Sequence, residues 1–121
     1  MKTTIEIRTQ FEGLHHWPDA PDDVAFLRNL HRHLFHVEVV IAVNHHDRET
    51  EFFQAKSLID MALCDIGKRY HSECVFSRYR DLGAMSCEMI AVWIMETLAL
   101  HMEICRVTVR EDDENSATVT R

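Results

Sequence analysis

The sequence predicts an α+β fold in which two helices pack on one face of an antiparallel sheet of four strands, in the order ββααββ. Apolar and polar residues alternate near both ends of the chain, and the apolar period changes to that of a helix in between. The length of 121 residues suits a single hydrophobic core, which serves roughly 50–200 residues. We therefore expect one α+β domain over residues 1–121.

Two long strands are expected in the first third of the chain. Over residues 3–15 apolar side chains occupy odd positions and charged ones even positions, the pattern of a strand with one buried face. A loop rich in proline and aspartate begins at Trp17, and alternation returns from about His31 to Asn44. The two strands can then pair as antiparallel neighbours around this loop.

Two helices are expected in the middle of the chain. Apolar residues recur at helical spacing over residues 52–66, and Gly67 is expected to end this helix. Residues 68–85 form a polar and aromatic connection without a regular period. Ser86 is a favourable N-cap for a second helix, which is expected to end near His101.

Two shorter strands are expected to close the fold. Alternation returns over residues 104–111, and residues 117–120 are long enough for one last strand. The acidic run at 111–114 between them is expected to be a solvated turn. These segments complete the ββααββ order.

Composition excludes several classes of protein. The 13 Lys+Arg are scattered and are outnumbered by 20 Asp+Glu, which gives a net charge of −7 and argues against a nucleic-acid partner. No apolar run approaches the ~18–20 residues that span a bilayer, and the N-terminus lacks the apolar region of a signal peptide. The four cysteines have no C-x-x-C spacing, which argues against a zinc knuckle. We expect a cytoplasmic protein with no membrane partner.

Histidines give the clearest local signal. His31 and His33 lie at i and i+2 in a predicted strand, so both imidazoles project to the same side. An H-x-H pair alone also fits two exposed polar residues at a strand end. His15, however, ends the neighbouring strand on the same odd face, and strand pairing would bring it beside them. Three neutral imidazoles form a suitable site for Zn²⁺. His16 is the second choice for the first ligand, because it lies on the polar face.

Five short motifs resemble those of the 6-pyruvoyl- and 6-carboxy-tetrahydropterin synthases. FEGLH at 11–15 resembles F-x-A-A-H, and LHRH at 30–33 resembles L-H-G-H. EFFQAK at 51–56, SCE at 86–88 and VTVRE at 107–111 resemble D-F-x-x-L-K, T-x-E and V-x-V-x-E. The motifs occur in the family's order over nearly the whole chain. The resemblance implies the T-fold, whose subunits assemble into barrels, and we expect a homo-oligomer, namely a hexamer built from trimers.

The resemblance also implies a ligand and a metal. It implies zinc held by His15, His31 and His33, and a pterin, such as dihydroneopterin triphosphate, or a purine-like ring anchored by Glu111. A carboxylate can accept two hydrogen bonds from adjacent N–H groups of such a ring. The alternative for Glu111 is an ordinary acidic turn residue. It shares a strand face with Val109 and other apolar residues, which favours the binding role.

Three positions depart from the family pattern. The family's catalytic cysteine, four residues before the first histidine of H-G-H, corresponds to Leu27, which cannot transfer a proton. His71 is the best remaining general acid or base, but Tyr70 stands where the family has a carboxylate beside that histidine. Arg32 replaces the glycine of H-G-H. The metal ligands and the ring anchor are thus retained, while the standard proton-transfer groups are incomplete.

Two functions therefore remain open. The chain is either a carbon–oxygen or carbon–carbon lyase of the tetrahydropterin synthase type or a non-catalytic protein that sequesters or senses a purine or pterin nucleotide. The replacement at Leu27 supports the second. A compensating base among Cys74, Asp22 and Asp23 is the less favoured hypothesis. A purely structural oligomer with vestigial histidines is least favoured.

Overall fold

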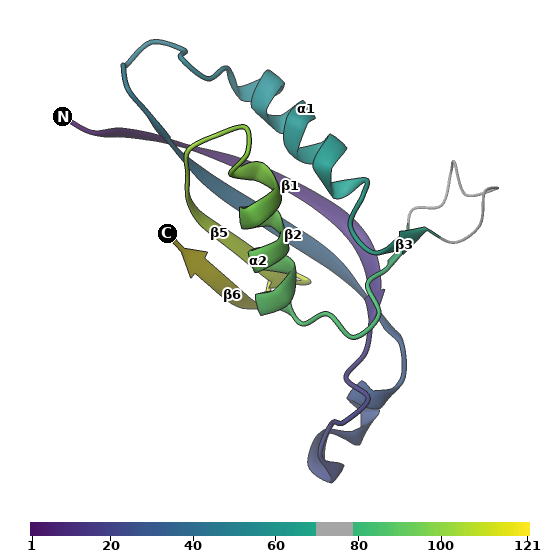
Figure 1. The fold of residues 1–121 in the computed structure, drawn as a ribbon. Helices are drawn as coiled ribbons and strands as arrows, with labels where there is room; N and C mark the ends of the chain where they lie inside the picture. The colour runs from purple at the N-terminus through teal and green to yellow at the C-terminus, as the bar shows by residue number, and fades with distance from the viewer. Residues whose placement is uncertain (70–78) are drawn as a thin grey trace.

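A six-stranded sheet with two α-helices on one face forms the protein in this computed structural model, which describes residues 1–69 and 79–121 (Figure 1). The sheet order is β3-β4-β1-β2-β5-β6. In chain order the elements are β1 (Thr3–His15), the 3₁₀ segment η1 (Asp22–Arg28), β2 (His31–Val43), α1 (Phe52–Leu63), β3 (Lys68–Arg69), β4 (Tyr79–Asp81), α2 (Cys87–Leu98), β5 (Ile104–Glu111) and β6 (Asn115–Thr120). The α+β class and the ββααββ order of the long elements are confirmed.

A long antiparallel pair, β1 and β2, forms the centre of the sheet. The two strands pair along their whole length, from Thr3 opposite Val43 to His15 opposite His31. The odd residues of β2 from Phe35 to Ile41 are fully buried in the core beneath the helices, as the alternation predicted. The strand β5 pairs antiparallel with the other edge of β2, so that Phe35 lies opposite Glu111. This register brings the end of β5 next to the histidine-bearing end of the hairpin.

The prediction of only four, wholly antiparallel strands is incomplete. The short strands β3 and β4 extend the sheet, and β4 pairs parallel with β1 around Gly13. Strands of two and three residues are too short to show a period, and for this reason the sequence pattern missed them. The N–H of Leu82 then donates to the carbonyl of Leu14 at 2.8 Å, and the buried Leu82 side chain joins the core.

Gly67 does not end the first helix, contrary to the prediction. The helix α1 already ends at Leu63, and Gly67 forms part of the turn into β3 with a φ of 68°. A Cβ at Gly67 would lie 2.5 Å from the backbone oxygen of Asp81. Glycine is therefore needed here for close contact between two backbone segments.

Side-chain caps begin both α-helices. The predicted N-cap Ser86 accepts a hydrogen bond from the N–H of Met89. The carboxylate of Glu51 caps α1 by accepting from the N–H groups of Phe53 and Gln54. The helix α2 ends at Leu98, three residues before the predicted His101.

Two connections differ in detail from the predictions. The loop after Trp17 contains the 3₁₀ segment η1, which is interrupted at Val24 by a non-helical backbone conformation. The expected acidic turn is present between β5 and β6, and Asp112 and Asp113 both have positive φ there. The strand β6 begins at Asn115, two residues before the predicted start.

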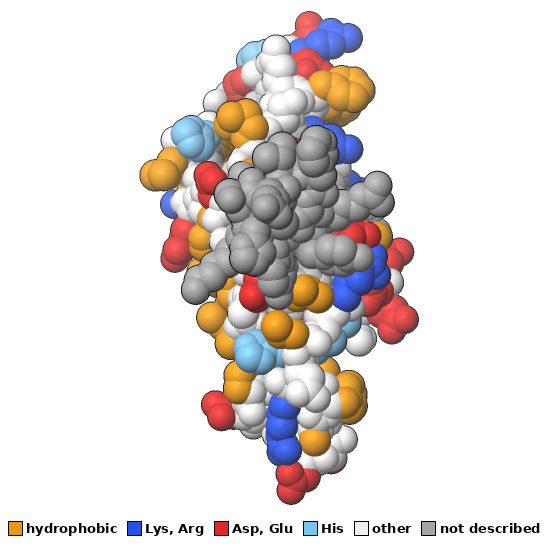
Figure 2. Space-filling model, turned by 90° about the vertical axis from the view of Figure 1, so that its right-hand side faces the viewer, with side chains coloured by type: hydrophobic (Ala, Val, Ile, Leu, Met, Phe, Trp, Pro, Cys, Tyr) orange, Lys and Arg blue, Asp and Glu red, His pale blue; other side chains and the backbone are white. Residues whose placement is uncertain are grey.

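The described surface carries charges of both signs. On the face shown in Figure 2, acidic and basic side chains are interspersed and apolar side chains form small separate groups. In the described part of the chain, no helix is both long and apolar enough to cross a bilayer.

Candidate metal centre and adjoining pocket

The structure brings the three predicted histidines together at one end of the central hairpin. Pairing of β1 with β2 places His15 opposite His31, and His33 follows on the same face. One ring nitrogen of each lies within 4.8 Å of those of the other two. The ring centroids are 4.6 Å (His15–His31), 5.1 Å (His15–His33) and 5.0 Å (His31–His33) apart.

Each imidazole is oriented by an oxygen atom outside the cluster. The Nδ1 atom of His15 lies 2.8 Å from the carbonyl of Met85, and that of His31 lies 2.8 Å from the carbonyl of Asn29. The Nδ1 atom of His33 lies 2.6 Å from Oδ2 of Asp112. Since these oxygens accept, each Nδ1 donates its hydrogen, and in a neutral imidazole the lone pair is then on Nε2. Histidines that bind metals are oriented in this way.

Burial keeps the innermost histidine neutral. The side chain of His15 is 10% exposed, and burial lowers its pKa more than the Met85 carbonyl and the Glu111 carboxylate raise it. A neutral imidazole is the form that binds a metal. A group of three histidine ring nitrogens suits Zn²⁺, which takes three protein ligands in catalytic sites.

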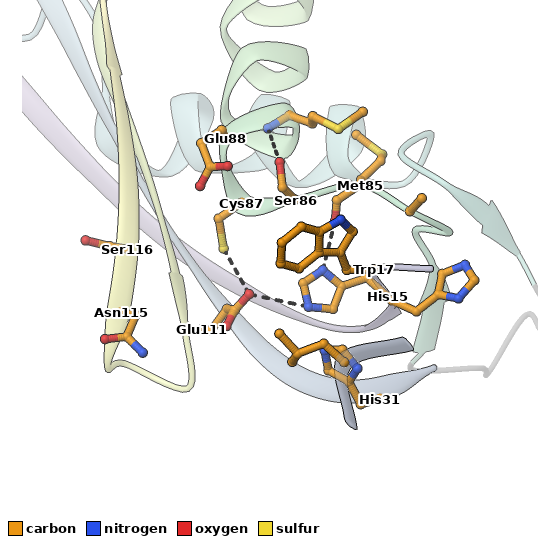
Figure 3. A pocket seen from close by; sticks show the side chains of 14 residues that line it. His15, Trp17, His31, Met85, Ser86, Cys87, Glu88, Glu111, Asn115 and Ser116 are labelled. Atoms are coloured by element: carbon orange, nitrogen blue, oxygen red, sulfur yellow. Dashed lines mark hydrogen bonds and ion pairs between the residues drawn. The ribbon is translucent and has the colours of Figure 1, made fainter. Parts of the chain in front are cut away.

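Glu111 lies beside the histidine cluster. Its Oε1 is 3.4 Å from Nε2 of His15 (Figure 3). Its Oε2 is 3.6 Å from Nε2 of His33. The predicted ring anchor therefore shares one site with two of the predicted metal ligands. Its side chain is 28% exposed, which leaves the carboxylate accessible from the adjoining pocket.

The thiol of Cys87 also belongs to this site. It is buried in the core, but its Sγ lies 3.5 Å from Oε1 of Glu111, to which it donates (Figure 3). Burial, reinforced by the Glu111 carboxylate, raises the pKa of Cys87 to about 12. The thiol thus stays protonated and does not replace the missing base. Its only sequence signal was its position inside the SCE motif.

A pocket of about 580 Å³ opens next to the cluster. Its walls come from the β1–β2 connection, the start of α2 and the turn between β5 and β6, and it is lined by His15, His16, Trp17, Leu27, His31, Ala84, Met85, Ser86, Cys87, Glu88, Met89, Glu111, Asn115 and Ser116. Leu27 presents an apolar side chain at the position of the family cysteine. Trp17 and His15 both line this pocket (Figure 3).

The other candidate residues are not all brought to the pocket. His16 lines it, but its Nδ1 lies 3.2 Å from the carbonyl of Arg28 and it is not part of the three-histidine group. Asp22 pairs with Arg28 at 2.8 Å, and neither Asp22 nor Asp23 is among the described residues of the lining. The candidates His71, Tyr70 and Cys74 lie outside the described residues.

A family model identifies the chain. The model of the 6-pyruvoyl tetrahydropterin synthase family matches residues 4–121. The chain belongs to this family. No curated protein sequence matches the chain at a significant level.

Solved structures of the family share this fold. The 6-pyruvoyl tetrahydropterin synthase of Caenorhabditis elegans aligns with a TM-score of 0.71 at 17% identity, over 100% of this chain and 96% of that one. An uncharacterised protein of Wolinella succinogenes aligns with a TM-score of 0.67 at 16% identity, over 100% of this chain and 99% of that one. The 6-pyruvoyl tetrahydropterin synthase of Plasmodium vivax aligns with a TM-score of 0.63 at 15% identity, over 100% of this chain and 98% of that one. A variant of that enzyme in which cysteine replaces a catalytic glutamate is also similar. At these identities the likeness supports the T-fold alone.

Proposed function

We propose that this protein binds zinc and a pterin or purine-like ligand at the histidine cluster and its adjoining pocket. The grouping of three histidine ring nitrogens, with the Glu111 carboxylate beside His15 and His33, supports this proposal most strongly. His15, His31 and His33 would hold the metal. When bound, zinc would supply Lewis-acid polarisation of an oxygen on the ligand.

Glu111 would anchor the ring edge of the ligand. Its carboxylate would accept hydrogen bonds from two adjacent N–H groups, as an amidine-like edge of a pterin or guanine presents them. The S–H of Cys87 would continue to donate to Oε1 and so hold the carboxylate in place. The apolar wall formed by Trp17 and Leu27 would exclude water from the ring.

Catalysis would require a proton-transfer group in addition to the metal ligands and the ring anchor. A lyase of the tetrahydropterin synthase type needs a proton acceptor near the ligand side chain, and we assign this role to His71. A second candidate function is non-catalytic binding, which sequesters or senses a pterin or purine nucleotide. Leu27 in the pocket wall favours this second function, because it stands where the family motif has its catalytic cysteine and leucine carries no titratable group.

Metal analysis tests the zinc assignment. The protein purified without chelator is expected to hold one zinc per chain, and His31→Ala/His33→Ala is expected to hold none. His45→Ala/His46→Ala is the matched control, because this pair lies at the opposite end of the hairpin. Full zinc content in the first double variant would contradict the assignment.

Ligand titration tests the ring anchor. Neopterin is expected to bind the zinc-loaded protein, and Glu111→Ala is expected to abolish binding because the ring's N–H groups would lose their acceptor. Glu114→Ala in the same turn is the control, since Glu114 does not line the pocket. Equal affinity of both variants would contradict the role of Glu111.

Homo-oligomerisation and a cytoplasmic location are also part of the proposal. The sheet ends in β3 on one side and β6 on the other, and open edges favour pairing between subunits. We expect a hexamer built from trimers. A stable 14.2 kDa monomer in light scattering at micromolar concentration would contradict this expectation.

A further inference from the structure

We propose that Asp112 is the positioning residue that holds His33 in the tautomer required for metal binding. The inference rests on the proposed function, because it concerns the same histidine cluster. Its basis is the 2.6 Å hydrogen bond from Nδ1 of His33 to Oδ2 of Asp112. This contact joins the β5–β6 turn to the second strand of the hairpin.

Asp112 is itself fixed by the backbone of β2. Its N–H donates to the carbonyl of Leu34, and its Oδ1 accepts from the N–H of Leu34, both at 2.8 Å. Its backbone has a φ of 50°, which Asp and Asn adopt more readily than most residues. With one carboxylate oxygen held by Leu34, the other is left to face His33.

The partner of His33 differs in kind from those of the other two ligands. His15 and His31 donate to neutral carbonyl oxygens, whereas His33 donates to a carboxylate. Hydrogen bonds to a charged acceptor are shorter and stronger, and a carboxylate raises the basicity of the imidazole that it holds.

A carboxylate can only accept, and this determines the tautomer of His33. Nδ1 must carry the hydrogen, so the Nε2 lone pair points away from Asp112, on the side where Glu111 lies. In an Asp112→Asn variant the amide oxygen would keep the bond to Leu34 N–H and the amide NH₂ would face His33. The NH₂ group donates, so Nδ1 would accept and Nε2 would carry the hydrogen. The lone pair for the metal would be lost without loss of the imidazole.

Zinc affinity, measured by competition with a chromophoric chelator, tests this role directly. Asp112→Asn is expected to weaken zinc binding by about 10–100-fold, the usual effect of removing such a partner. Asp112→Gly is expected to lose less zinc affinity than Asp112→Asn, because a water molecule can then accept the hydrogen bond from Nδ1 of His33. Asp113→Asn is the matched control with unchanged affinity, since Asp113 has a similar φ but no hydrogen bond to a histidine in the described part of the chain. Wild-type affinity in folded Asp112→Asn would overturn the inference.

Nitrogen NMR of the metal-free protein gives a second measurement that does not depend on zinc or on any activity. His33 is expected to carry its hydrogen on Nδ1 in the wild type and on Nε2 in Asp112→Asn. The same spectra report whether each variant is folded. If the wild type binds no zinc, the proposed function fails, and the tautomer change still supports the positioning role of Asp112. An unchanged His33 tautomer in the folded Asn variant would overturn that role whatever the metal result.

Discussion

Cys87 donates its thiol hydrogen to Glu111 across a distance of 3.5 Å, and both side chains line the candidate ligand pocket. The contact joins the start of α2 to the end of β5. Because the pKa of Cys87 is raised to about 12, the thiol is a fixed donor at neutral pH and not a nucleophile. This arrangement supplies a hydrogen-bond partner for Glu111 before any ligand arrives.

Alkylation measures this property. In the folded protein at pH 8, a thiol with a pKa of about 12 has only about one thiolate in ten thousand, so iodoacetamide is expected to leave Cys87 unmodified. Peptide mass spectrometry reads the extent of modification, and the protein in urea is the control in which all four cysteines react. Rapid modification of Cys87 in the folded protein would show that the thiol is activated.

The sequence predicted the elements that depend on period and on strand pairing. Alternation fixed the faces of β1 and β2, and an antiparallel pair of these strands had to bring His15 beside His31. The sequence pattern could not predict the roles of Asp112 and Cys87. Asp112 contacts His33 only because a turn with positive φ places it against Leu34, and no period encodes such a turn. Likewise, Cys87 counts as an apolar residue in the helical pattern whether or not its sulfur contacts a carboxylate.

Gly13→Ala is expected to destabilise the fold. An added Cβ would lie 2.9 Å from Cε2 of Phe35, a fully buried ring, and 2.9 Å from Cδ1 of Leu82. Such overpacking costs about 1–3 kcal/mol, more than the ~0.4–1 kcal/mol gained because alanine restricts the unfolded chain. Urea unfolding of the variant measures the change in free energy.

A second substitution tests the cause of that loss. Gly13→Ala is expected to lower the free energy of unfolding less in a Phe35→Leu background than in the wild type, because the smaller leucine side chain makes room for the added methyl group. Additive losses would show that contact with Phe35 is not the reason for glycine at this position.

Glu51 is expected to make helix α1 sensitive to acid. Hydrogen bonds from the N–H groups of Phe53 and Gln54 lower the pKa of its carboxyl below the ordinary value of 4.5. The stabilisation is therefore complete above pH 4.5 and is lost as the pH falls through the lowered pKa of the folded state. The loss of unfolding free energy in Glu51→Ala is expected to be largest at neutral pH and to shrink towards pH 3. Urea unfolding at both values measures it, with Glu114→Ala as the control, and a loss independent of pH would refute the capping role.

Leu27 stands where the resemblance to the family places a catalytic cysteine. Its side chain lines the pocket, and the backbone is fixed there by the hydrogen bond from the N–H of Trp17 to the Leu27 carbonyl at 2.7 Å. Proton transfer by a positioned group typically contributes about 10²–10⁴-fold to a rate. We therefore expect the zinc-loaded wild type to bind dihydroneopterin triphosphate but to convert it slowly or not at all.

Substitution at this position tests that expectation. Leu27→Cys and Leu27→Glu are expected to raise turnover by up to the same ~10²–10⁴-fold, because each puts a titratable group on the pocket wall. Leu27→Met, which fills similar space without such a group, is the control, and chromatographic separation of pterin products gives the rates. If neither variant gains activity, the pocket differs from the catalytic relatives in more than the base. Wild-type turnover equal to that of a cysteine-bearing relative would refute the prediction. Another residue would then have to take the proton, and His71 would be the first residue to substitute.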